Sequence, residues 1–184
     1  MLDSQVGSIR WRLLIYTVPS EPSRKRAFVW RELKKAGAVY LRDGVCALPE
    51  REDTAVAMDR IVAKIQEFEG EPTVIAGAEL DARRAQAIAE TSRKDRQQEY
   101  AEVLREGDSL LKHVQRETQH RDFTFAELEE LEADLEKLRG WAQQIQSRDY
   151  FGCPEAADAA ALLERCADAL SSFAEAASEQ EAVR

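Results

Sequence analysis

The stretch WRLLIYTVPSEPSRKRAFVWRELKKAGAVYLRDGVCALP, residues 11–49, decides the fold of this chain. It begins with an apolar run, Trp11–Val18, that is typical of a central strand buried on both faces, and Pro19 ends the run. A helix is predicted over about residues 22–36, because capping serines and a proline stand at its start and Gly37 follows it. Its apolar positions share one face, and the basic residues fall mostly elsewhere. This apolar face is expected to contain Ala27, Trp30, Leu33 and Gly37, with Val29 and Ala36 beside it.

The sequence after this helix predicts the rest of a small sheet. Two short strands, 38–41 and 45–49, flank Asp43-Gly44, which favours a hairpin because both positions tolerate positive φ. A second helix over about 52–69 carries a regular apolar stripe, and a last short strand spans 73–76. The order β-α-β-β-α-β predicts an α+β, ferredoxin-like fold, in which an antiparallel sheet carries two helices on one face.

The second half of the chain, 78–184, shows no strand signals and three amphipathic helices. The first spans roughly 80–119, and its polar middle, 91–98, is a candidate break. The third begins near Pro154. Three such helices with short connections predict an antiparallel three-helix bundle. We therefore expect two domains, a ferredoxin-like domain at 1–77 and a helical bundle at 78–184.

The second helix of this half has the clearest local signature in the chain. Thr124 and Glu127 match a capping box, and Phe123 and Leu128 match the hydrophobic staple that accompanies it. Leucines, an alanine and an isoleucine then recur at intervals of three and four residues. The helix is therefore predicted to begin at Thr124 and to bury one apolar stripe.

The net charge is distributed unevenly. The chain carries −9 overall, but residues 1–77 hold 12 Lys and Arg against 11 Asp and Glu, a net +1, whereas residues 78–184 carry −10. An acidic chain is a poor general binder of nucleic acid, because phosphate binding rests on cationic side chains. Any such role needs a local basic surface, and the first predicted helix offers one. We interpret these residues either as contacts to DNA phosphates or as the solvated outer face of a packed helix: Arg24, Lys25, Arg26, Arg31, Lys34 and Lys35.

The cysteines and histidines give no metal-binding pattern. Cys46, Cys153 and Cys166 are far apart and odd in number, and the chain has only two histidines, His113 and His120, which are expected to be solvated. No metal site and no cofactor are therefore predicted. Free cysteines fit a reducing compartment. No leader and no apolar run of about 18 residues is apparent, so we expect a cytoplasmic chain without a membrane segment.

Several segments resemble the N-terminal domain of the chromate-resistance regulator ChrB family. In the first half, the residues that carry the resemblance are WRLLIYTVPSEPSR at 11–24, VWRELKKAGAVYL at 29–41 and DGVCALP at 43–49. In the second half they are Glu99-Tyr100, FTFAELEELE at 123–132 and RDYFG at 148–152. The resemblance implies a chromate-responsive transcriptional regulator of a chromate-efflux operon that binds operator DNA as a homodimer. It also implies that longer members carry a further C-terminal domain beyond the region that this chain covers.

The first half is also similar in outline to the central domain of the phenylacetate-pathway repressors and to the small CRISPR adaptation nucleases. Those nucleases place a metal-binding aspartate at the end of their first strand. Here that position reads Tyr16-Thr17-Val18-Pro19, without a carboxylate, so metal-dependent cleavage is disfavoured. The chain also shows no Ser-His-Asp set, phosphate loop or HExxH motif, and we expect it not to be an enzyme.

Chromate sensing has two candidate chemistries in this sequence. As a dianion, chromate would bind guanidinium groups or helix N-termini, but the spacing of the available arginines, Arg12, Arg24, Arg42 and Arg148, defines no pocket. As an oxidant, it would attack an accessible thiol with a lowered pKa. Cys153 is the redox-sensing candidate, because it precedes Pro154 at a predicted helix N-terminus, whereas Cys46 and Cys166 read as core residues.

One alternative from a different class remains open at this point. The sheet and the bundle would equally serve a protein-interaction or dimerisation scaffold that makes no direct contact with DNA. In that case the basic residues of the first helix are solubilising, and their removal leaves partner binding unchanged.

Overall fold

The computed structural model describes residues 9–120 and 124–182 and divides them into two compact units. The first unit contains the described residues up to Lys94 together with Arg148–Phe151. The second unit contains Asp95–Ser147 and the residues from Gly152 onward. This division falls later along the chain than the expected boundary between residues 77 and 78, which remains a prediction about separately folding domains.

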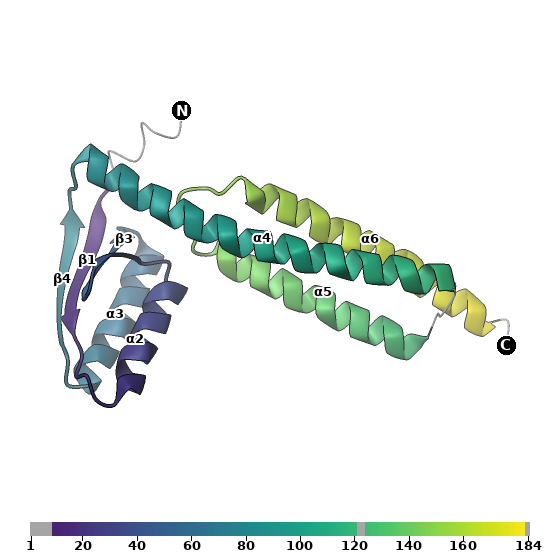
Figure 1. Ribbon diagram of the computed structural model, residues 1–184, viewed down its shortest axis with the longest axis horizontal. Coiled ribbons are helices and arrows are strands. Elements are labelled where there is room, and N and C mark those ends of the chain that lie inside the picture. Colours follow the sequence, from purple (N-terminus) through teal and green to yellow (C-terminus); the bar gives the residue numbers. More distant parts are fainter. Residues whose placement is uncertain (1–8, 121–123, 183–184) are drawn as a thin grey trace. The chain divides into compact units, whose positions relative to one another are not determined.

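The first unit is built on a four-stranded antiparallel sheet (Figure 1). Its strands are β1 (Trp11–Thr17), β2 (Val39–Arg42), β3 (Val45–Pro49) and β4 (Glu71–Ala78), in the order β2-β3-β1-β4. The two helices between the strands, α2 (Ser23–Lys35) and α3 (Glu52–Glu67), cover one face of the sheet. The predicted α+β, ferredoxin-like fold is confirmed, and the apolar run at the start is β1, one of the two central strands. It is not buried along both faces, because Ile15 is 43% exposed.

Turn residues set the register of the sheet. Gly44 has φ of +69° in the hairpin between β2 and β3, and its carbonyl accepts a hydrogen bond of 2.7 Å from the N–H of Tyr16 on β1. A Cβ at this position would lie 2.6 Å from the carbonyl oxygen of Tyr16, so only glycine permits the close approach. The hairpin expected at Asp43-Gly44 is therefore fixed both by its backbone conformation and by its contact with β1.

The core between the sheet and the two helices shows where α2 packs. Val29 and Leu33 are fully buried, whereas the side chain of Trp30 is 52% exposed and Ala27 is exposed. The predicted apolar face of α2 is therefore wrong at Trp30. Val29 and Leu33, which are one turn apart, face the sheet, and Trp30 points away because it follows Val29 by about 100° around the helix axis. The buried residues of this core are Leu14, Val29, Leu33, Ala38, Cys46, Leu48, Met58, Ile61 and Ile65.

The opposite face of the sheet is covered only in part. The first turns of α4 (Ala82–His120) place Ala85 and Ile88 against Trp11, and Phe151 completes the cluster. The rings of Trp11 and Phe151 stack with centroids 5.9 Å apart. The hydroxyl of Tyr150 donates a hydrogen bond of 2.9 Å to the carbonyl of Ala36, the C-cap residue of α2. Residues 148–151 therefore pack with the sheet although they follow the second helix of the bundle in sequence.

The second unit is an antiparallel three-helix bundle, made of α4 from Asp95 onward, α5 (Phe125–Gln146) and α6 (Glu155–Ala182). Helix α4 is continuous, so the predicted break at 91–98 is wrong. Residues 82–106 contain neither proline nor glycine. The side chain of Arg96 is buried but satisfied, since it donates hydrogen bonds of 2.7 and 3.2 Å to the two carboxylate oxygens of Glu99. A polar stretch whose side chains find partners continues a helix without a break.

Two local contacts shape the ends and the packing of the bundle helices. Thr124 caps α5 by accepting a hydrogen bond of 3.2 Å from the N–H of Glu127, as the capping box predicts, whereas Phe123 of the predicted staple lies outside the described residues. Gly107 lies where α4 and α6 approach closely, because a Cβ there would be 2.8 Å from a methyl carbon of Leu162.

Over the described residues, no helix combines the length and the apolar character needed to cross a membrane.

Candidate nucleic-acid interface

The candidate basic residues lie on the outer side of α2, and the structure separates them into two stripes. Arg24, Arg31 and Lys35 are seven and four residues apart and follow one line along the helix. Arg26, Trp30 and Lys34 are four residues apart and follow a second line. Between the two lines lies the exposed Ala27. The outer side of α2 therefore carries basic side chains on both sides of Ala27.

Three arginines on this surface are available to a ligand. Arg24, Arg26 and Arg31 are exposed, and no residue in the described part of the chain holds any of them by a hydrogen bond or ion pair. Guanidinium groups match phosphate geometry with two parallel hydrogen bonds and are less strongly hydrated than ammonium groups. These three side chains are the ones that can bind an oxyanion without first losing an intramolecular partner.

Lys25 is engaged within the fold instead. Its Nζ donates a hydrogen bond of 3.3 Å to the carbonyl of Phe68, lies 3.6 Å from a carboxylate oxygen of Glu69 and stands 5.8 Å from the centre of the Phe68 ring. Its side chain is only 22% exposed. Lys25 therefore ties the first turn of α2 to the end of α3, and of the six predicted contacts it has the clearest structural role.

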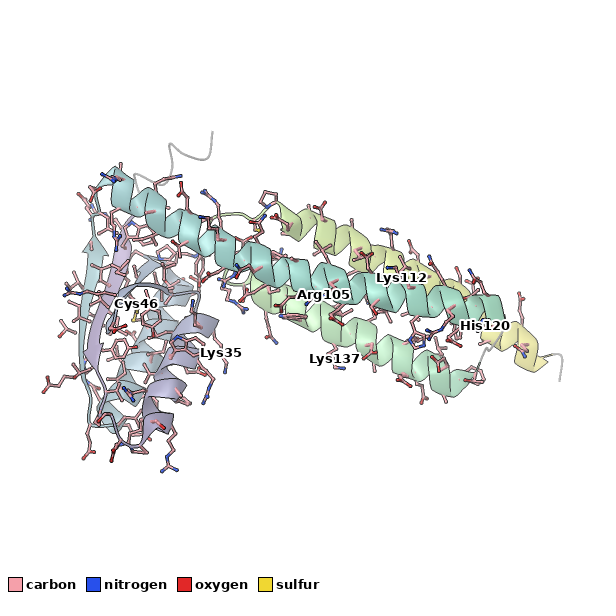
Figure 2. All side chains as sticks on the ribbon, viewed as in Figure 1. Lys35, Cys46, Arg105, Lys112, His120 and Lys137 are labelled. Carbon is pink, nitrogen blue, oxygen red and sulfur yellow. The ribbon has the colours of Figure 1, made fainter. Side chains whose placement is uncertain are left out.

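Lys34 and Lys35 occupy the last turn of α2. Lys35 is 71% exposed and pairs with Glu32 at 2.8 Å, and Figure 2 labels it at this end of the helix. Lys34 is partly buried and has a partner of its own. Cations at a helix C-terminus also stabilise the helix through its dipole, which accounts for both lysines without a ligand.

Two residues near this surface were not found from the sequence. Trp30 was assigned to the packed face, but it stands exposed one turn from Arg26 and one turn from Lys34. Arg60 on α3 is exposed and lines a groove of about 320 Å³ between α2 and α3, opposite Lys35. The signal for Trp30 was its position beside Val29, since only one of two neighbouring helix positions can face the sheet.

The predicted redox-sensing thiol is buried. Cys153 is 6% exposed, lies in the core of the bundle and donates a hydrogen bond of 2.9 Å from Sγ to Glu155. This hydrogen bond is the main reason that the pKa of Glu155 is lowered. A carboxylate next to the sulfur disfavours a thiolate, and burial limits access. Cys153 does lie next to the start of α6, as expected, but the structure gives it no open approach, and its sensing role remains a prediction.

The other two thiols are core residues, as expected. Cys46 is fully buried between the sheet and its helices, and burial raises the pKa of this thiol to about 12 (Figure 2). Cys166 is also fully buried, and burial raises the pKa of its thiol too. Its Sγ donates a hydrogen bond of 3.4 Å to the carbonyl of Gly107. Neither thiol is poised as a nucleophile at neutral pH.

The four arginines that were considered for chromate lie on different elements. Arg12 on β1 donates a hydrogen bond of 3.1 Å to Glu50 at the end of β3, and Glu50 also accepts one of 3.0 Å from the N–H of Gly77. Arg24 opens α2, Arg42 ends β2, and Arg148 belongs to the segment after α5. Arg12 therefore fastens three strands together rather than offering a free guanidinium group.

The histidines behave differently from each other. His120 is exposed at the end of α4, as expected. His113 is not simply solvated, because its Nε2 lies 3.1 Å from a carboxylate oxygen of Glu127 and 3.5 Å from one of Glu117. These three residues form the group that could hold a metal ion within the described part of the chain.

Comparison with known proteins identifies one family. The family model described as "Protein ChrB, N-terminal" matches residues 26–182, which include most of α2 and all of the following elements. Searches of curated proteins and of solved structures gave no match. The ChrB family is associated with chromate resistance. Since the match covers most of both compact units, the chain belongs to the ChrB N-terminal family.

Proposed function

We propose that this chain is a chromate-responsive transcriptional regulator of a chromate-resistance operon and that the outer side of α2 binds operator DNA. The observation that carries the DNA contact is the set of three exposed arginines without intramolecular partners, Arg24, Arg26 and Arg31. Family membership supports the link to chromate resistance. A non-enzymatic role, a cytoplasmic location, a homodimer and chromate as effector belong to the same proposal.

The charge distribution supports a DNA contact in this part of the chain. Residues 78–184 carry a net charge of −10, so the bundle repels phosphates, whereas residues 1–77 carry +1. Helix α2 presents four exposed cations, Arg24, Arg26, Arg31 and Lys35. Exposed arginines position a protein on the duplex through the phosphates. Trp30 adds an aromatic surface between two cations, which would contact sugar or base atoms and contribute apolar area that salt does not screen.

The test is titration of a promoter duplex and a scrambled duplex with the purified chain, at several salt concentrations, with and without chromate. Each phosphate contact adds about −0.9 to the slope of log affinity against log salt concentration. Replacing Arg24, Arg26 and Arg31 together by alanine is expected to make the slope shallower by about 3 per protomer. Trp30→Ala is expected to weaken binding with an unchanged slope.

A matched control removes the same charge elsewhere. Arg105, Lys137 and Arg139 on the bundle are 70%, 81% and 40% exposed, and their joint replacement by alanine is expected to leave the slope unchanged. Equal loss of affinity in both triple variants would show that only net charge matters. Binding that does not prefer the promoter, or that chromate does not weaken, would refute a complete regulator in this chain.

A second candidate function is a dimerisation scaffold without DNA contact, and one observation favours it. Ile15 on β1 and Ile75 on β4 are each 43% exposed, and the register Leu13↔Ile75 puts both on the sheet face away from α2 and α3. A second copy of this chain would bury them. Ile15→Thr is expected to weaken a dimer in sedimentation equilibrium if this face is the interface. Under this second function, neither the parent chain nor the variant is expected to bind the promoter duplex.

A further inference from the structure

A mixed cluster of one imidazole and two carboxylates lies in the second unit and shares no residue with the proposed DNA contact. His113 and Glu117 are on α4, and Glu127 is in the first turn of α5. The Nε2 atom of His113 lies 3.1 Å from Oε1 of Glu127 and 3.5 Å from Oε1 of Glu117. One ligand atom from each of the three residues lies within 4.8 Å of the other two.

The helices hold these three side chains together. His113 and Glu117 are four residues apart on one helix, which places them on the same face one turn apart, the spacing at which two side chains chelate one ion. Glu127 is fixed from its other side, because its N–H donates to the cap residue Thr124. The side chains of His113, Glu117 and Glu127 are 34%, 15% and 26% exposed, so the cluster is largely shielded from solvent but not sealed.

The distances fit a small divalent cation. Zinc binds imidazole nitrogen and carboxylate oxygen at about 2.0–2.2 Å in a tetrahedron, so two of its ligands lie about 3.3–3.6 Å apart. The separations of 3.1 and 3.5 Å from His113 Nε2 are close to this edge length. Calcium needs six to eight oxygen ligands, and magnesium usually keeps several waters, so an imidazole favours a first-row transition metal over both.

We propose that His113, Glu117 and Glu127 form a binding site for a divalent first-row transition-metal ion, of which Zn²⁺ is the representative. Three protein ligands leave at least one coordination position for water or an anion. An ion here links the last turns of α4 to the first turn of α5. The site is independent of the proposed DNA contact, so either proposal can fail without the other.

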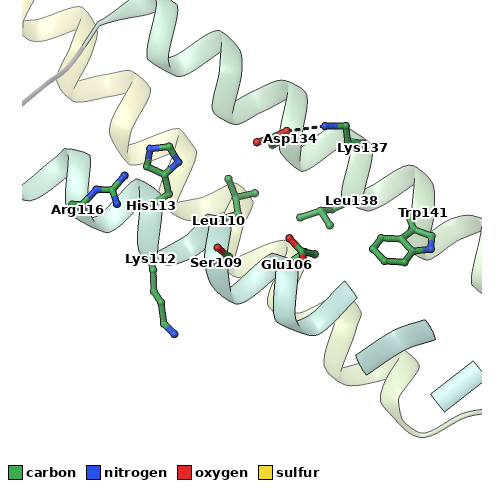
Figure 3. Close-up of a pocket in the computed structure, with 10 residues that line it drawn as sticks. All are labelled: Glu106, Ser109, Leu110, Lys112, His113, Arg116, Asp134, Lys137, Leu138 and Trp141. Atoms are coloured by element: carbon green, nitrogen blue, oxygen red, sulfur yellow. Dashed lines mark hydrogen bonds and ion pairs between the residues drawn. The ribbon is translucent and has the colours of Figure 1, made fainter. Parts of the chain in front are cut away.

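A pocket gives the site access to solvent. A cavity of about 700 Å³ between α4 and α5 is lined by His113 and Arg116, and Figure 3 shows both on α4, with Asp134, Leu138 and Trp141 contributed by α5. Nε of Arg116 lies 3.0 Å from the same Glu117 oxygen that faces His113. The guanidinium therefore neutralises the carboxylate that a metal ion would take over, and the two cations compete for it.

This competition gives the sharpest test. The EDTA-treated chain of residues 1–184 is titrated with Zn²⁺ by calorimetry, and with Co²⁺ by visible absorption, which reports the coordination geometry. Removing one direct ligand, in His113→Ala, Glu117→Gln or Glu127→Gln, is expected to weaken binding by about a hundredfold or more, since even indirect supporting residues cost 10–100-fold. Arg116→Ala is expected to tighten binding, an effect that a purely structural role of the cluster does not produce.

The controls separate this site from others. His120→Ala removes the other histidine, which is exposed, and Cys153→Ser removes a buried thiol. Both are expected to leave the dissociation constant within about twofold, because neither residue supplies a ligand atom to the cluster. Circular dichroism establishes that each variant is folded. Zn²⁺ should raise the melting temperature of the parent chain but not that of the ligand variants. Unchanged affinity in the ligand variants, or loss of binding on removing Cys153, would overturn the proposal.

Discussion

Removal of the Phe151 side chain is expected to destabilise the first unit strongly. Phe151 is 7% exposed and stacks on Trp11, which is fully buried. The ring fills the space between the sheet and the first turns of α4, where Ala85 and Ala89 are too small to close a cavity. Truncating a buried phenylalanine to alanine costs about 3–5 kcal/mol, through lost transfer free energy and the cavity left behind. A typical domain has only about 5–15 kcal/mol of stability, so the loss is a large fraction of the total.

Hydrogen exchange resolved to peptides is the suitable assay, because it reports the two units separately. The protection of β1 amides in Phe151→Ala is expected to fall by about a hundredfold or more, since each 1.4 kcal/mol is a factor of about ten. Phe125→Ala is the matched control, as Phe125 is 50% exposed at the start of α5, and surface substitutions usually change stability by less than about 0.5 kcal/mol. If Phe151→Ala changed β1 protection no more than Phe125→Ala, residues 148–151 would not be part of the sheet's core.

Three smaller perturbations test other contacts. Hydrogen bonds from Arg12 and Gly77 lower the pKa of Glu50 in the folded chain. The carboxylate therefore contributes to the free energy of unfolding at pH values above its unfolded pKa, and this contribution is lost as the pH falls through the folded pKa. Glu50→Gln should make the urea unfolding midpoint less sensitive to acid, and an unchanged pH profile would contradict this. Thr124→Ala removes the cap of α5 and should cost about 1 kcal/mol in thermal unfolding, with Thr124→Ser near neutral as its control. The three thiols are buried, so a thiol reagent should label the native protein slowly. In denaturant the same reagent should label all three cysteines. Rapid labelling of Cys153 in the native protein would show that this thiol is accessible enough to act as a redox sensor.

The architecture of the first unit was predictable because its signals are local. The apolar run at β1, the glycine at the hairpin and the stop after α2 each act within a few residues, and together they allow few arrangements other than the one observed. Phe151 is the counterexample. It follows α5 by several residues in sequence and joins the sheet through long-range packing in the cluster that contains Trp11. No periodicity could assign a short, irregular segment to a core formed by residues more than sixty positions earlier.

The candidate interface was predictable in composition but not in geometry. The six basic residues of α2 are evident from the sequence, but whether each can bind a ligand depends on the residues that contact it in the fold. Lys25 is held by the carbonyl of Phe68 and the carboxylate of Glu69, which lie more than forty residues further along the chain. Trp30 was placed on the wrong side because Val29 and Trp30 are both apolar, and a phase error of one residue rotates the assumed face by about 100°. Contacts distant in sequence therefore decide which charges can meet a ligand.

The proposed metal site could not be predicted from the number and spacing of histidines and cysteines. With two histidines and no paired cysteines, the sequence offers no familiar ligand spacing. The first half of the site, His113 and Glu117, is visible as a pair four residues apart, but such pairs are common on exposed helices. The third ligand, Glu127, is assigned by the sequence to a capping box, in which its side chain would turn back to the start of α5. In the structure the threonine half of that box forms, and the Glu127 carboxylate lies against His113 instead. The Glu127 side chain, which the capping box would use, is therefore available to complete a site between two helices. Replacing Glu127 with glutamine distinguishes the two roles, since glutamine can still cap the helix but lacks the carboxylate charge that binds a metal ion.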